Sequence, residues 1–242
     1  MKKTINLFFV LLSLVLYAQK KEYKSAEKAF KKGDVILSES IISDNASIFD
    51  SADEKIKNQV KFLLARINHH NKKYSLALNG YNELKDDPSL KIQIQEKLKV
   101  LSGDFITAAI EESEAKEFLK SSEKLYLAYT IDNEAGMDYL YYASQNAING
   151  GDYKMALGYL IELKEKKYSG SVTNYFATEV ASGNEIALDA TQYKFYQKSD
   201  DYSEFREEVT PSKYPEIVKN IALIYAKQGE TEKALEAVKE AR

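Results

Sequence analysis

Apolar and polar positions alternate along the chain with the period of amphipathic helices, most clearly over residues 140–163. In the first half of this stretch, Leu140, Ala143 and Ala147 fall on one face of a helix. Residues 149–152 then interrupt the pattern with two glycines, which close helices, and an aspartate, which caps the next one. The second half resumes the spacing with Tyr153, Ala156, Leu157, Leu160 and Leu163. The pattern predicts two short helices joined by a tight turn.

Two helices of this length cannot bury their apolar faces against each other alone, so the pattern favours an array of neighbouring pairs. Similar pairs can be laid over residues 22–43, 57–84, 104–128 and 215–242. A partial apolar stripe also predicts an extra helix near 89–101. In an alternative register this helix pairs through a turn at 103–105, but Glu96 then stands where a small residue belongs. The register with its turn at Lys116 is therefore preferred.

The pair at 140–163 resembles the tetratricopeptide repeat, or TPR, a helix pair of about 34 residues. The resemblance rests on the small residues Ala143 and Ser144, the turn at 151–153, and Ala156. In that family small residues let the helices approach, and a tyrosine fills the gap between repeats. The corresponding places here are Val35, Tyr74, Phe118, Tyr153 and Thr231. The resemblance implies an all-α TPR-type helix-turn-helix solenoid, a right-handed superhelix, with one small β-hairpin insertion.

The domain organisation follows from where this pattern holds and where it changes. Residues 20–166 carry about four helix pairs and residues 215–242 carry a final pair. Between them lies an insertion at 167–214, in which β-formers around a turn predict a β-hairpin at 171–188. The segment 192–197 fits a short helix or a further strand, and 200–210 is predicted to be an acidic, polar loop.

The N-terminal stretch, residues 1–19, has the pattern of a bacterial signal peptide. Lys2 and Lys3 precede an apolar run that is too short to span a membrane comfortably, and cleavage is expected after Ala18 or Gln19. The alternative is an uncleaved membrane anchor. Cleavage predicts an exported protein without a stable membrane span, in the periplasm, at the cell surface or secreted.

Composition narrows the functional classes. The net charge of −3 and the lack of an evidently basic stretch argue against a nucleic-acid partner. The chain has no cysteine, which excludes disulfides and thiolate chemistry. His69 and His70 are adjacent and point about 100° apart on a helix, so they are not expected to share a metal, and both are assigned to a solvated helix end. Known catalytic and phosphate-binding motifs are missing, so no enzyme, metal or cofactor is predicted.

The resemblance also implies a binding groove for a protein or peptide partner, lined by the first helix of each pair. Carried over residue by residue, its places are Phe62, Arg66, His70, Ile106, Ile110, Glu114, Tyr141, Gln145, Asn149, Lys219, Leu223 and Lys227. The basic carboxylate clamp of some chaperone-binding members is not recognisable, so that ligand class is not implied. The predicted function is a non-enzymatic, protein- or peptide-binding scaffold outside the cytoplasm.

Two other functions stay open. The insertion carries an aromatic cluster, which suggests a glycan-binding or small-ligand protein, or an enzyme, that uses 167–214 as its site. The cluster consists of Tyr175, Phe176, Tyr193, Phe195 and Tyr196. A purely structural assembly module is the other alternative. The final pair has no polar capping helix after it, so its uncapped C-terminal end is expected to offer a surface for self-association.

Overall fold

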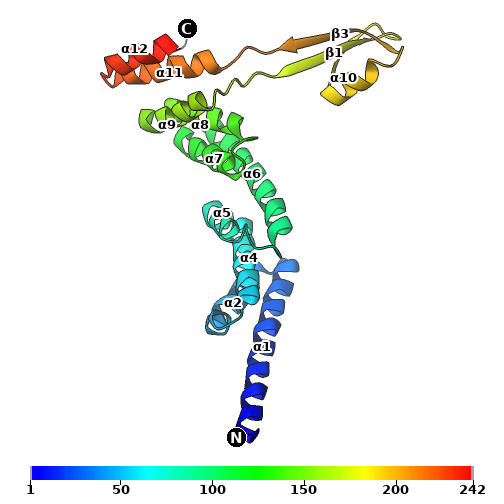
Figure 1. Ribbon diagram of the computed structural model, residues 1–242, viewed down its shortest axis with the longest axis vertical. Coiled ribbons are helices and arrows are strands. Elements are labelled where there is room, and N and C mark those ends of the chain that lie inside the picture. Colours follow the sequence, from blue (N-terminus) through cyan, green and yellow to red (C-terminus); the bar gives the residue numbers. More distant parts are fainter. Residues whose placement is uncertain (1, 241–242) are drawn as a thin grey trace. The chain divides into compact units, whose positions relative to one another are not determined.

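The computed structural model describes residues 2–240, and the side chains of residues 17–239. Within these residues the chain forms twelve α-helices and three β-strands (Figure 1). It divides into two compact units, Met1–Phe105 and Ile106–Arg242. Each unit is built from helix pairs around its own apolar core.

The first unit contains two helix pairs and the beginning of a longer helix. Its elements are α1 (Lys2–Lys31), α2 (Val35–Asp44), α3 (Ala46–Asp50), α4 (Glu54–His70), α5 (Tyr74–Asn82) and the first part of α6 (Lys91–Glu114). Ala26 of α1, Ile42 of α2 and Leu63 of α4 meet in one buried cluster. The helical spacing of apolar residues on each helix is what creates this shared core.

The second unit contains the remaining helix pairs and the insertion. Its elements are the rest of α6, α7 (Phe118–Ile131), α8 (Met137–Asn149), α9 (Tyr153–Glu165), β1 (Thr173–Glu179), β2 (Glu185–Leu188), α10 (Ala190–Tyr196), β3 (Tyr202–Val209), α11 (Tyr214–Lys227) and α12 (Thr231–Glu240). Leu140, Leu160 and Ile221 are fully or almost fully buried in its core. The pair α11–α12 therefore packs onto α8–α9, although the insertion separates them in sequence (Figure 1).

One turn geometry joins the two helices of every pair. The second residue after the end of the first helix has a positive φ, and it is Gly33, Lys72, Lys116, Gly151 or Gly229. In the turn at Gly151, its N–H donates to Ile148 O at 3.0 Å and the N–H of Asp152 donates to Ala147 O at 3.0 Å. The same two bonds recur in the other four turns, which makes each a Schellman motif. The five predicted turns are all present.

A second repeated feature is a small buried residue near the start of the second helix. Its members are Ser38, Ala77, Ser121, Ala156 and Ala234, of which the first four are fully buried. A small side chain lets the second helix lie close to the first. The close approach is visible between α4 and α5, where a Cβ added to Gly80 comes within 2.8 Å of Ala65 Cβ.

The extra helix predicted near 89–101 does not exist as a separate element. Residues 91–114 form the single helix α6, which carries the third turn at its end. Ile94, Leu101 and Phe105 are buried at 1%, 0% and 1% exposure, so one apolar face continues through the predicted break. Gly103 faces open space and does not interrupt the helix.

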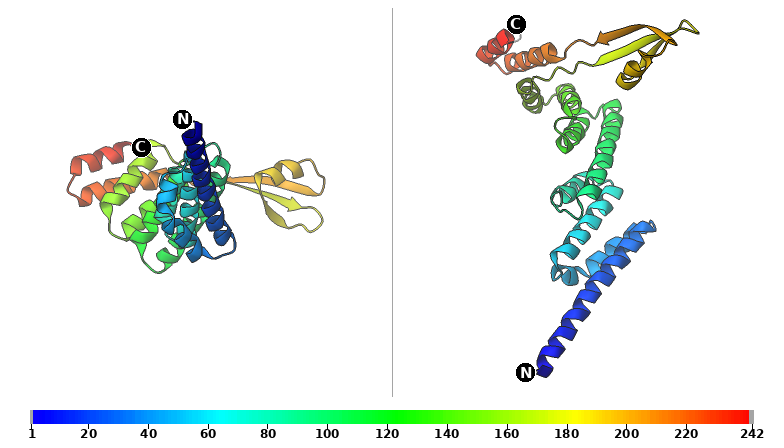
Figure 2. Two further views of the ribbon diagram at one scale, coloured as in Figure 1. Left: turned by 90° about the horizontal axis from the view of Figure 1, so that it is seen from below. Right: turned by 45° about the vertical axis from the view of Figure 1, so that its right-hand side comes forward.

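The insertion is a three-stranded antiparallel sheet in the order β2-β1-β3. The predicted hairpin is β1 and β2, with Phe176 opposite Ala187. The predicted polar loop at 200–210 is wrong, because most of it forms β3, with Arg206 opposite Phe176. Few apolar residues alternate along β3, so its strand pattern is weak. The segment 192–197, which fitted either a short helix or a further strand, lies mostly within helix α10. This helix is capped by Asp189 and lies against one face of the sheet (Figure 2).

The predicted signal peptide falls within α1, and the side chains of residues 1–16 lie outside the described part. No helix in the described residues is long and apolar enough to cross a membrane. Export and cleavage stay predictions.

Candidate functional site

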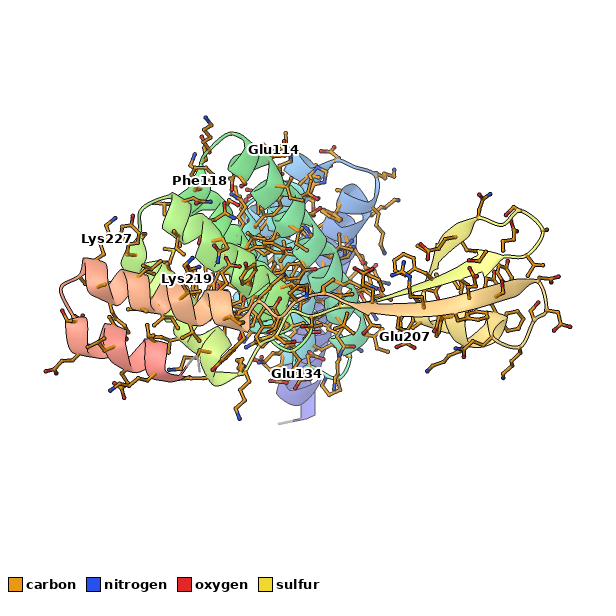
Figure 3. All side chains as sticks on the ribbon, turned by 90° about the horizontal axis from the view of Figure 1, so that it is seen from above. Glu114, Phe118, Glu134, Glu207, Lys219 and Lys227 are labelled. Atoms are coloured by element: carbon orange, nitrogen blue, oxygen red, sulfur yellow. The ribbon has the colours of Figure 1, made fainter. Side chains whose placement is uncertain are left out.

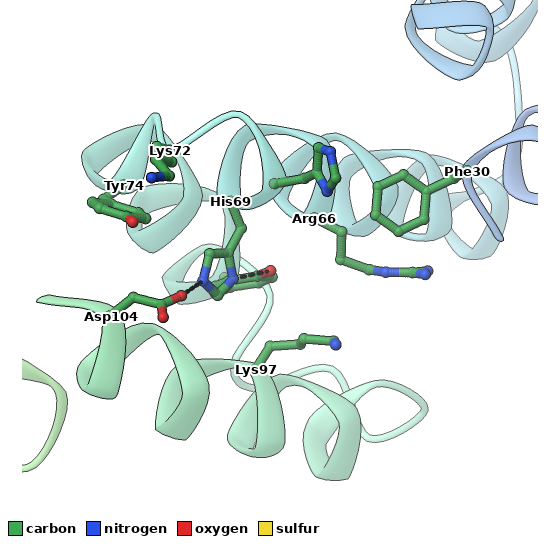
Figure 4. A pocket seen from close by; sticks show the side chains of 9 residues that line it. Phe30, Arg66, His69, Lys72, Tyr74, Lys97 and Asp104 are labelled. Carbon is green, nitrogen blue, oxygen red and sulfur yellow. Dashed lines mark hydrogen bonds and ion pairs between the residues drawn. The ribbon is translucent and has the colours of Figure 1, made fainter. Parts of the chain in front are cut away.

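A basic pocket opens in the first unit beside α4, with a volume of about 360 Å³ (Figure 4). We call it the α4 pocket. Arg66 and His70 come from α4, Lys72 from the turn after it, and Lys97 and Asp104 from α6. Phe30 of α1 and Tyr81 of α5 contribute to its wall. Two of the residues predicted for a binding groove, Arg66 and His70, therefore line one cavity.

Arg66 is flanked by aromatic rings, and its one ion pair, with Glu27, is long. Its guanidinium carbon lies 4.5 Å from the centre of the Phe30 ring and 5.6 Å from that of Phe62, and its side chain is 16% exposed. Its nearest acidic group is Glu27, at 3.9 Å, which is beyond hydrogen-bonding distance. Glu27 lies closer to Lys31, at 3.0 Å. Stacking thus orients a guanidinium that donates no hydrogen bond within the described chain.

His69 lies at the centre of a hydrogen-bonded chain that includes Asp104 and Tyr81 (Figure 4). Its Nε2 is 2.8 Å from Asp104 Oδ2, and its Nδ1 is 3.3 Å from the Tyr81 hydroxyl. Burial raises the pKa of Tyr81 well above its usual value, so the hydroxyl stays protonated. Because a carboxylate only accepts hydrogen bonds, Nε2 of His69 donates to Asp104 Oδ2. The prediction of a solvated helix end is wrong for His69, whose side chain is only 11% exposed.

The third groove residue of α4, Phe62, is 4% exposed and belongs to the interior. Its ring lies 6.0 Å from that of Tyr81 and also contacts Arg66. Phe62 therefore supports the pocket by positioning Arg66 and Tyr81 and does not present a surface to a partner.

A second hollow, of about 370 Å³, lies between α6, α7 and α8 in the second unit. We call it the α6–α8 groove. The predicted residues Ile106, Ile110 and Glu114 line it from α6. From α8, however, the groove is lined by Tyr142 and Asn146 rather than by Tyr141 and Gln145. The face that α8 presents is thus one residue further along than the alignment of repeats predicts.

Tyr141 is instead part of the core of the second unit. Its side chain is 7% exposed, and its hydroxyl donates to Glu216 Oε2 of α11 at 2.8 Å. Gln145 is half-buried on α8, and Asn149 is exposed at the end of that helix. The packing of α11 against α8 and α9 covers the predicted position of Tyr141, and sequence spacing contains no information about that contact.

The predicted residues of the last pair lie elsewhere again. Lys219 and Leu223 line an apolar groove between α11 and α12, with a volume of about 490 Å³. Lys227 lies at the end of α11 (Figure 3). Its Nζ donates to the Tyr153 hydroxyl at 2.6 Å. The predicted groove residues of the second unit therefore do not line one common surface.

The aromatic residues of the insertion do not form one platform. Tyr175 and Tyr193 pack together between the sheet and α10, with ring centres 4.7 Å apart. Phe176 lies on the opposite face, 4.2 Å from the Arg206 guanidinium. Tyr196 stacks on Tyr202 at 4.1 Å, and only Phe195, at 69% exposure, is widely open to solvent.

Of the nine residues that line the pocket, sequence reasoning assigned only Arg66 and His70 to a binding groove. It missed the other seven, which are Phe30, His69, Lys72, Tyr74, Tyr81, Lys97 and Asp104. Lys97 and Asp104 are separated by two helical turns on α6, a spacing that places them on one side of a helix. Interpreting residues 91–114 as one helix would have shown this. Nothing in the sequence indicates that this side faces Arg66 and His69.

Five helix pairs share one turn geometry and a small residue at the same place in the second helix. The fold is TPR-like. No family model matches the sequence, and no curated protein matches it either. The solved structures that resemble the chain include BtubC (BKLC) from P. vanneervenii, with 12% identity, a TM-score of 0.35, and coverage of 99% of this chain and 84% of that one.

Two further solved structures share similarity over most of the chain. One is a putative kinesin light chain of Podosopora anserina with nearly identical TPR-like repeats, at 11% identity and a TM-score of 0.33, covering 92% of each chain. The other is Pseudomonas aeruginosa pilF, at 11% identity and a TM-score of 0.31, covering 91% of this chain and 73% of that one. At such values the matches carry no statement about function.

Proposed function

We propose that this chain is a non-enzymatic repeat scaffold that binds a protein or an extended peptide outside the cytoplasm. The observation that supports it is the α6–α8 groove, which consecutive helix pairs line with exposed apolar side chains. Ile110 is 55% exposed and Tyr142 is 49% exposed. Apolar side chains that converge in a groove contribute most to the free energy of binding when a partner covers them and excludes water. Tyrosine is enriched among such binding residues.

The edges of the α6–α8 groove are polar, as a peptide site requires. Ser113 and Glu114 line it from α6, and Asn146 lines it from α8. The Ser113 hydroxyl donates to Asn146 Oδ1 at 3.1 Å, which orients the amide across the groove. In this groove the side chains of an extended peptide contact the apolar residues, and its backbone amides hydrogen-bond to the polar residues at the edges.

The proposal is tested by in-cell crosslinking and identification of captured proteins. Ile110→Glu places a charge in the groove, and Tyr142→Ala removes its largest exposed ring. The matched control is Ile92→Glu, which changes an isoleucine of the same helix that is 72% exposed and does not line the groove. We expect both groove variants to lose the partner while Ile92→Glu retains it. Unchanged capture by folded Ile110→Glu protein contradicts the proposal.

Action outside the cytoplasm rests on the N-terminal pattern of two lysines followed by an apolar run. Expression of the full chain in a bacterium, followed by fractionation and N-terminal sequencing, tests it. The expected mature protein is exported and begins at Gln19 or Lys20. A full-length chain that stays with the cytoplasmic fraction refutes this part of the proposal and leaves the groove unaffected.

A further inference from the structure

We propose that the α4 pocket is a binding site for a phosphate group. The site is independent of the α6–α8 groove, because all its residues belong to the first unit. The inference rests on an oriented guanidinium without hydrogen bonds, on two lysines of the same pocket that form no ion pair within the described chain, and on the way in which the local carboxylates are already engaged.

The guanidinium of Arg66 is the anchor. A guanidinium carries five N–H donors in a fixed fork that matches the oxygens of phosphate or carboxylate. Arg206 shows how this chain satisfies such a group, since it donates to both Glu185 and Glu208 at 2.9–3.2 Å. Arg66 is far less exposed than Arg206, at 16% against 46%, and yet lacks any such bond. Its donors are oriented by Phe30 and left for a ligand.

The charges around Arg66 favour an anion with more than one negative charge. Lys72 and Lys97 line the same pocket, and neither forms an ion pair with a described residue. The single carboxylate of the pocket, Asp104, accepts a hydrogen bond from His69. The three cations of the pocket outnumber Asp104 and the nearby Glu27, which pairs more closely with Lys31. This excess of positive charge favours an anion such as a phosphate monoester, which carries about −1.5 to −2 near neutral pH.

The placement of the cations also favours phosphate over a carboxylate. Arg66 from α4 and Lys97 from α6 extend on the same side of His69, whereas Lys72, from the turn after α4, lies on the other side of it (Figure 4). A planar carboxylate offers two oxygens in one plane, which a single guanidinium satisfies. A phosphate group offers three or more oxygens in different directions and accepts hydrogen bonds from Arg66 and Lys97 together. His70 on α4 adds a further donor at the edge.

Isothermal titration calorimetry of the purified protein at low salt tests the site, with inorganic phosphate, phenyl phosphate and benzoate as probes. Inorganic phosphate measures binding to the anion site alone. Phenyl phosphate is a phosphate monoester with an aromatic ring, so it can be compared directly with benzoate. We expect both to bind and benzoate to bind about tenfold more weakly than phenyl phosphate. Arg66→Gln is expected to weaken phosphate binding at least about tenfold, whereas the control Arg206→Gln leaves it unchanged.

Two further variants separate lost binding from lost folding. Lys97→Gln alters a half-buried side chain at the edge of the pocket and is expected to weaken binding about two- to fivefold. Asp104→Asn removes the negative charge that lines the pocket and is expected to tighten binding by a similar factor. The inference is overturned if phosphate fails to bind, if folded Arg66→Gln protein binds it like the parent, or if benzoate binds as tightly as phenyl phosphate.

Discussion

The repeated small residue of the second helices provides a sharp test of how this fold is stabilised. Ser38 and Ser121 occupy the same place in two helix pairs, and both are fully buried. The Ser38 hydroxyl donates to Ala26 O at 2.9 Å. The Ser121 hydroxyl has no hydrogen-bond partner within the described chain. The equivalent residues Ala77 and Ala156 show that a methyl group fits this place.

The two serines should therefore respond to alanine substitution with opposite signs. A buried hydroxyl without a partner costs about 1–3 kcal/mol, so Ser121→Ala is expected to raise the free energy of unfolding by about 1 kcal/mol. Ser38→Ala removes a satisfied hydrogen bond and leaves the Ala26 carbonyl without this donor. It is expected to lower the free energy of unfolding by about 0.5–1.5 kcal/mol.

Urea unfolding followed by circular dichroism measures both changes. Ser38 and Ser121 belong to different units, so each variant is expected to shift the transition of its own unit where the two units unfold separately. In thermal unfolding, 1 kcal/mol corresponds to about 2–4 °C for a chain of this size. The reasoning is refuted if Ser121→Ala lowers stability, or if both variants shift it in the same direction.

Three other outcomes follow from the helix pairs. Gly80→Ala is expected to lower the free energy of unfolding by about 1–3 kcal/mol, because the new Cβ comes within 2.8 Å of Ala65 Cβ. Gly158 has open space around it, so Gly158→Ala is expected to raise the free energy of unfolding by up to about 1 kcal/mol. Urea unfolding measures both changes. Equal effects of the two glycine variants argue against the close contact. Lys116→Gly relieves a positive φ of 63° and is expected to add about 0.5–1 kcal/mol in the same assay, and a loss of stability contradicts this assignment. Burial raises the pKa of Tyr159 from its usual 10.0 to about 12. The stability that its protonated form contributes is therefore complete below pH 10 and is lost as the pH rises through about 12. Tyr159→Phe should reduce this loss in alkaline titrations followed by circular dichroism, and an unchanged profile contradicts the reasoning.

Much of the architecture could be predicted because it depends on residues close together in sequence. The spacing of Leu140, Ala143 and Ala147 defines a helix face without reference to anything distant. The turns were found even at Lys72 and Lys116, where lysine takes the place of the favoured glycine, because the flanking helix patterns set their positions. The β1–β2 hairpin was predictable for the same reason, since its two strands follow each other across a short turn.

The candidate sites depended on contacts between elements that lie far apart in the sequence. Arg66 and His70 were predicted for a binding groove, but Lys97 and Asp104 join them only because α6 passes α4. Tyr141 was predicted for the surface and is buried, because α11 returns after the insertion and packs on α8 and α9.

The sequence by itself therefore determined the helix pairs, their turns and the presence of a β insertion, because helical spacing and turn chemistry act over a few residues. The tertiary structure decided which helix faces meet, and with them the α4 pocket and the α6–α8 groove. It also decided that Arg66 is stacked on Phe30 and donates no hydrogen bond to a carboxylate of the described chain. The physical reason is that burial and charge pairing belong to contacts between helices, and the pattern along one helix does not specify what lies opposite.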